Sequence, residues 1–88
     1  MGKNKINMEA KEIYVKDGIF NGSKDIFTIM EDGSLLYKTY MGDKIIDFEN
    51  PTLVPCGKGQ RINFDSGGSA PFKDYTTGEL DKKWTKIK

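Results

Sequence analysis

Two glycine-containing turns in the middle of the chain restrict its fold more than any other feature. The segment Met30-Glu31-Asp32-Gly33-Ser34 fits a three-residue hairpin loop, in which Gly33 closes a type I turn from the left-handed region. The segment Met41-Gly42-Asp43-Lys44 fits a two-residue type II′ turn, which has glycine first. Strand-forming residues flank both turns, so residues 26–48 are predicted to form two consecutive β-hairpins.

The two turns also predict which residues lie opposite each other. The first turn pairs Phe27 with Tyr37, and the second pairs Tyr37 with Phe48. Because side chains alternate between the faces of a strand, these three rings are expected side by side in one aromatic row. The same face is predicted to hold Ile29, Leu35, Thr39 and Ile46. Two independent turns thus predict a single apolar face.

The opposite face of the double hairpin is expected to mix charged and apolar side chains. Lys38 and Asp47 are predicted to lie opposite each other there. Five apolar or aromatic residues project to the same side: Ile26, Met30, Leu36, Tyr40 and Ile45. A solvated sheet face would normally alternate more cleanly. We therefore expect this face to be covered, either by another part of the chain or by a partner.

The rest of the chain predicts an all-β, mainly antiparallel fold. Alternation at 12–16 and 60–65 predicts two strands, and Pro51 and Pro55 limit 52–55 to a short or edge strand. Residues 19–20 continue an apolar segment after a turn at 17–18. The tail is ambiguous, because 76–79 has capping-box spacing, but Trp84, Thr85 and Ile87 favour a last strand. We expect a meander sheet or small barrel of five to seven strands, with a short C-terminal helix as the alternative.

The length and the composition indicate one small domain with flexible parts. The 88 residues are enough for a single small core, so we expect one β-rich domain that spans residues 1–88. The polar residues 1–9 and the Ser/Gly-rich segment 65–71 are expected to be flexible. The net charge of +1, from 14 basic and 13 acidic residues, gives no general attraction to nucleic acid or to acidic membranes.

Residue types argue against most catalytic chemistry. The segment Asp65-Ser66-Gly67-Gly68 resembles the nucleophile region of chymotrypsin-like serine proteases, but their mechanism needs a histidine base and the chain has no histidine. The segment 56–59 contains Gly-Lys without the Ser or Thr of a phosphate loop. The single cysteine, Cys56, excludes an intrachain disulfide and is interpreted as structural or incidental, with a redox role as the alternative. We expect no enzymatic activity, no cofactor and no metal.

The leading functional hypothesis is a protein-binding module. The expected contact residues are Tyr14, Leu36, Lys38, Tyr40 and Ile45, and a homodimer formed through that face is one way to cover it. The richness in Lys, Ile, Asn and Asp is similar to that of proteins from AT-rich bacterial or phage genomes. As a small β-rich chain without histidine, the protein resembles many phage and mobile-element accessory proteins. Such proteins inhibit a host protein or assemble with a host or phage protein. Residues 1–5 lack the apolar core of a signal peptide and no apolar segment is long enough to span a membrane as a helix, so we expect a cytoplasmic location.

The alternative hypothesis is a small β-barrel that binds single-stranded nucleic acid. It combines an aromatic ring for base stacking with cations for the phosphates. The expected residues are Arg61, Lys82, Lys83, Trp84 and Lys86. In the simpler interpretation, Trp84 anchors the end of the chain in the core and the lysines are solvated.

Overall fold

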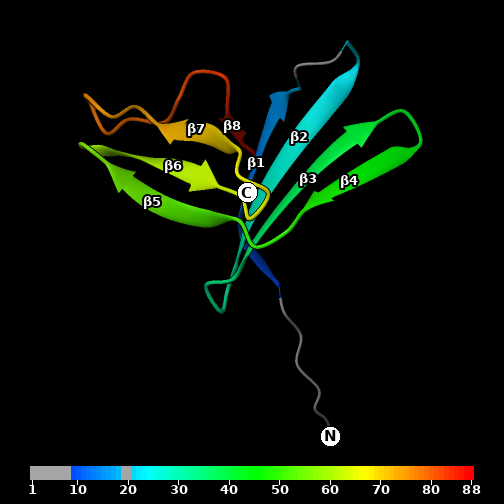
Figure 1. The fold of residues 1–88 in the computed structure, drawn as a ribbon, viewed down its shortest axis with the longest axis horizontal. Coiled ribbons are helices and arrows are strands. Elements are labelled where there is room, and N and C mark those ends of the chain that lie inside the picture. Colours follow the sequence, from blue (N-terminus) through cyan, green and yellow to red (C-terminus); the bar gives the residue numbers. More distant parts are fainter. Residues whose placement is uncertain (1–8, 19–20) are drawn as a thin grey trace, which may run out of the picture.

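Two antiparallel sheets make up the part of the chain that the computed structural model describes, residues 9–18 and 21–88 (Figure 1). The larger sheet has the strand order β4-β3-β2-β1-β8, and the smaller has the order β5-β6-β7. The strands are β1 (Ala10–Asp17), β2 (Ser23–Met30), β3 (Leu35–Met41), β4 (Lys44–Phe48), β5 (Thr52–Cys56), β6 (Gly59–Asn63), β7 (Ser69–Lys73) and β8 (Thr85–Lys86). These residues contain no helix, so the predicted all-β antiparallel class is confirmed.

The double hairpin forms with the predicted register. Phe27 lies opposite Tyr37 in the β2–β3 pair, and Tyr37 lies opposite Phe48 in the β3–β4 pair. Gly33 and Gly42 have φ values of 92° and 64°, in the region that favours glycine. The amide of Gly33 donates to the carbonyl of Met30 at 2.9 Å, as expected for the turn between β2 and β3. The two turns therefore set the register of the three central strands.

An aromatic core lies between the two sheets. From the larger sheet, Phe27 is fully buried and Tyr37 is 3% exposed. From the smaller sheet, Ile62 and Phe72 are buried against them, and the rings of Phe27 and Phe72 meet edge-on with centroids 5.1 Å apart. This edge-to-face geometry adds to the stabilisation that burial provides. The aromatic row predicted from the turns is thus the inner face of the larger sheet.

The C-terminal segment closes the core and ends in a strand. The Trp84 side chain is 4% exposed, and its indole Nε1 donates to the carbonyl oxygen of Pro71 at 2.8 Å. The chain then pairs with β1, where Thr85 lies opposite Val15. This confirms the expected final strand, and the helix considered as its alternative is absent from 76–88.

Two details differ from the sequence prediction. The described residues form eight strands rather than five to seven, because β7 was not expected. The first residues of β7 lie in the segment 65–71, for which the composition predicts a flexible loop. The carbonyl of Phe64 accepts from the amide of Gly67, and the Phe64 amide donates to Gly68, both at 3.0 Å, so this segment begins with a tight hairpin turn. Residues 1–8 and 19–20, for which flexibility and an apolar continuation were predicted, lie outside the described residues.

Replacing Phe27 with alanine is expected to cost about 3–5 kcal/mol of unfolding free energy, because the side chain is fully buried and both sheets pack on it. Urea unfolding followed by circular dichroism measures the change. The matched control is Ile87→Ala, at a side chain that is 62% exposed, for which less than about 0.5 kcal/mol is expected. Equal losses in the two variants would contradict this account of the core.

Candidate functional site

The face of the larger sheet turned away from the smaller one carries two exposed large apolar side chains, Leu36 and Ile45. Because side chains alternate along paired strands, the register assigns its members. We call this surface the outer face; it consists of Ile13, Val15, Ile26, Thr28, Met30, Leu36, Lys38, Tyr40, Ile45 and Asp47, with Asp17 and Lys24 at one margin. Leu36 is 44% exposed and Ile45 is 56% exposed, so among the described residues nothing buries them.

Four of the five residues predicted to bind protein lie together on the outer face. They are Leu36, Lys38, Tyr40 and Ile45, on the neighbouring strands β3 and β4. The expectation for Tyr14 is wrong: this residue lies opposite Phe27 on the inner face and is 6% exposed. Its ring packs edge-on against Phe72, with centroids 4.9 Å apart. On the outer face, β1 contributes Ile13 and Val15 instead, which the sequence analysis did not select.

The charges of the outer face are paired within it. Lys38 and Asp47, predicted to lie opposite each other, form an ion pair of 3.7 Å between β3 and β4. Asp17 and Lys24 form a second ion pair between β1 and β2. The four charges sum to zero, so the outer face attracts neither acidic nor basic partners by net charge.

The residues of the nucleic-acid hypothesis do not make one stacking surface. Trp84 is buried in the core, so its indole is not accessible to a base. Lys82, Lys83 and Lys86 are exposed around the C-terminal segment, whereas Arg61 lies on β6 and donates to the Ser69 hydroxyl at 2.7 Å. The exposed lysines therefore lack the aromatic partner on which the hypothesis depended.

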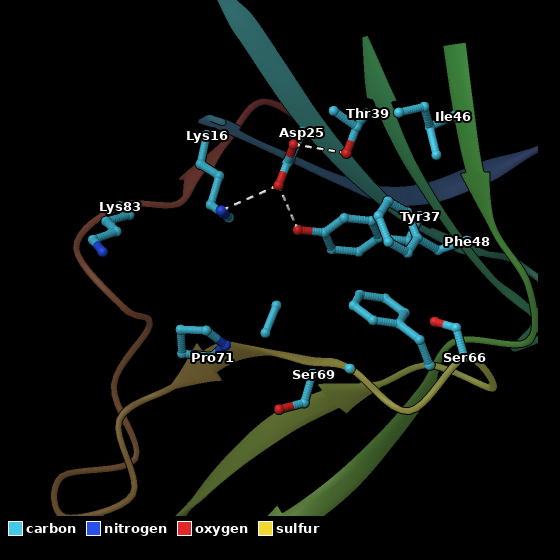
Figure 2. A pocket seen from close by; sticks show the side chains of 13 residues that line it. Lys16, Asp25, Tyr37, Thr39, Ile46, Phe48, Ser66, Ser69, Pro71 and Lys83 are labelled. Atoms are coloured by element: carbon cyan, nitrogen blue, oxygen red, sulfur yellow. Dashed lines mark hydrogen bonds and ion pairs between the residues drawn. The ribbon is translucent and has the colours of Figure 1, made fainter. Parts of the chain in front are cut away.

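A pocket that the sequence analysis did not predict lies between the two sheets (Figure 2). Its volume is about 390 Å³. The larger sheet supplies a polar wall, where Asp25 accepts hydrogen bonds from the Tyr37 hydroxyl at 2.7 Å and the Thr39 hydroxyl at 2.9 Å. The Lys16 ammonium pairs with the same carboxylate at 3.2 Å. We call Lys16, Asp25, Tyr37 and Thr39 the inner polar cluster.

Burial of the inner polar cluster changes the acidity of its tyrosine. Desolvation, followed by the hydrogen bond to Asp25 and the negative charge of that carboxylate, raises the pKa of Tyr37 far above its ordinary value. Tyr14, on the same face, donates to Glu12, and burial together with that carboxylate raises the pKa of Tyr14 to about 12. Both phenols therefore remain protonated donors across the physiological pH range.

Removing the carboxylate of Asp25 is expected to destabilise the fold strongly. Asp25→Ala leaves the Lys16 ammonium buried without its counter-ion, a change that costs about 3–5 kcal/mol when one partner of a buried pair is lost. The matched control is Asp47→Ala, which breaks the exposed pair with Lys38 and should cost less than about 1 kcal/mol. Urea unfolding at neutral pH measures both. Similar losses in the two variants would show that the cluster is not a buried pair.

Stability is expected to fall in alkali because Tyr14 must lose its proton in a buried position. The raised pKa of folded Tyr14 contributes stability that is complete below pH 10.0, the ordinary pKa, and is lost as the pH rises toward about 12. Urea unfolding at about pH 9 and about pH 11 should show a smaller decrease for Tyr14→Phe than for the unsubstituted protein. An equal decrease in the two proteins would contradict the assignment.

The described residues contain neither a helix able to span a membrane nor a group of three or more Cys, Asp or Glu side chains placed to hold a metal ion. Cys56, at the end of β5, is a half-buried free thiol. Comparison of the chain with protein-family models, with curated proteins and with solved structures gave no match.

Proposed function

We propose that this protein is a non-enzymatic protein-interaction module that uses the outer face of its larger sheet as the contact surface. The observation that carries the proposal is the exposure of Leu36 and Ile45 on the outer face of an otherwise regular antiparallel sheet. An antiparallel sheet with one solvated side normally turns polar residues to water. Here both sides of β1 to β4 carry apolar residues, and the smaller sheet covers only the inner one.

The occupant that fits this surface best is a second copy of the chain. In a dimer with two-fold symmetry the same patch contacts itself, so a net charge on it would cause repulsion. The outer face has two internal ion pairs, Asp17–Lys24 and Lys38–Asp47, and no net charge. Two copies can therefore approach without a like-charge penalty, and the apolar side chains between the pairs can pack together.

The size of the outer face predicts a weak, exchanging dimer. Four strands about 4.8 Å apart, each about seven residues long at about 3.3 Å per residue, present roughly 440 Å². Two copies would then bury about 900 Å² in total, which is below the size of most stable interfaces. We therefore expect assembly only at high protein concentration, or where other contacts hold the two copies together.

Sedimentation velocity between about 10 µM and about 1 mM tests the proposal, because a weak dimer dissociates on dilution. The unsubstituted protein should shift toward the dimer as concentration rises, and Leu36→Lys should remain a monomer because it places a charge among the apolar side chains of the contact. Tyr75→Lys is the matched control, since it adds the same charge at a side chain that is 62% exposed and lies beside the turn between β5 and β6 of the smaller sheet. A protein that stays monomeric throughout the range, or a loss of association in both variants, would rule out this interface.

A further inference from the structure

The pocket between the sheets has the composition of a ligand site rather than of an incompletely packed core. Its apolar lining comes from both sheets: Ile46 and Phe48 lie on β4 and Pro71 lies on β7. The rings of Phe48 and Phe64 are 4.6 Å apart. Its polar lining is the inner polar cluster on β1, β2 and β3, whose side chains converge on Asp25 in Figure 2. A largely apolar pocket with a few convergent polar groups is the common form of small-molecule sites. The inner face of a sheet that served only for packing would not need a buried ion pair.

The inner polar cluster has unused hydrogen-bonding capacity mainly on its cation. Asp25 accepts from Tyr37, Thr39 and Lys16, so both of its oxygens are engaged. The Lys16 ammonium has three donors, of which the pair with Asp25 needs one. It also lies 5.3 Å from the centre of the Trp84 ring, and the Lys16 side chain is only 11% exposed. Asp25 therefore positions Lys16, and Lys16 can donate to a further acceptor in the pocket.

The charges that line the pocket favour an anion. Lys16 and Asp25 cancel, and the remaining charged residue of the lining is Lys83, on the segment between β7 and β8 (Figure 2). The lining therefore has a net charge of +1, formed by two lysines and one aspartate. The low exposure of Lys16 means that salt and water screen its attraction to a ligand less than at the surface.

From this arrangement we propose that the pocket binds a small amphipathic carboxylate. The carboxylate contacts the Lys16 ammonium, the exposed Lys83 at the rim of the pocket adds positive charge, and the apolar body lies along Phe48 and Phe64. At about 30 Å³ per water, 390 Å³ holds roughly a dozen water-sized groups, which corresponds to a ligand such as decanoate with its twelve non-hydrogen atoms. This site is on the inner side of the larger sheet, so it is separate from the proposed dimer contact.

Isothermal titration calorimetry with decanoate and with decylamine, at neutral pH and low salt, tests the charge preference. We expect saturable binding of one decanoate per chain, about tenfold tighter than that of decylamine, because a charged hydrogen bond distinguishes the two. Trp84 is the single tryptophan and borders Lys16, so its fluorescence should change with decanoate. Equal affinity for the two compounds, or no saturable binding of decanoate, would overturn the proposal.

A substitution that fills the pocket tests whether decanoate binds there. Ile46→Trp places a large ring in the pocket and should abolish decanoate binding, whereas Ile45→Trp adds the same ring to the outer face and should leave it unchanged. Calorimetry is the readout for both variants, since each carries an added tryptophan. Unchanged binding in Ile46→Trp, or equal losses in both variants, would place the ligand elsewhere and overturn the proposal.

Two lysine substitutions test the role of charge. Lys16→Met leaves Asp25 as the charged group of the cluster and should reverse the preference, so that decylamine binds more tightly than decanoate. If Lys16→Met does not fold, the pair Lys83→Gln and Lys82→Gln decides the question: Lys83 lines the pocket and its neighbour Lys82 does not. Weaker decanoate binding in Lys83→Gln alone supports the proposal. No change in Lys83→Gln, or equal changes in both, overturns it.

Discussion

The contact between Phe27 and Phe72 is the interaction on which the rest of this structure depends. Phe27 lies at the centre of the larger sheet and Phe72 lies on the smaller one, and each is almost completely buried. Tyr14, Tyr37 and Trp84 surround this pair with ring contacts from three other segments. Without it, two small sheets would each expose an apolar side and neither would bury enough surface to be stable. The outer face and the pocket both follow from how this contact holds the sheets.

Local turn chemistry explains why so much of the larger sheet was predictable. Gly33 and Gly42 determine the register over a few residues, and no distant contact is needed to place Tyr37 between Phe27 and Phe48. The same reasoning would have found β7. The segment from Phe64 to Gly68 has the same hydrogen-bond pattern as the segment from Met30 to Ser34, with a glycine at the fourth position of each. Its Ser/Gly composition indicates flexibility, and for this reason the sequence analysis did not assign it the type of turn that it assigned to residues 30–34.

The candidate sites were predictable only where a strand pairing was known. Leu36 and Ile45 could be assigned to the outer face because their hairpin was fixed, whereas the register of β1 was not, and Tyr14 was selected for the wrong surface. The pocket depends on the approach of two sheets, which no local pattern encodes. One signal was available: extending the alternation of β2 by two residues from Phe27 places Asp25 on the apolar face. A carboxylate in that position requires partners, and Tyr37 and Thr39 were already assigned to the same face.

The order of the strands along the chain bears on how the protein folds. Within each sheet the neighbours are joined by short hairpins, apart from the pairing of β8 with β1, in which Val15 meets Thr85. Contacts between residues close in sequence form quickly. The pairing of β8 with β1 instead closes the loop from Val15 to Thr85, which has the largest entropic cost in the fold. The C-terminal strand should therefore join last, after the hairpins have formed, and should be the first to detach. Transient opening at that end would release Trp84 while leaving the central strands paired. Local unfolding should therefore begin in the C-terminal segment.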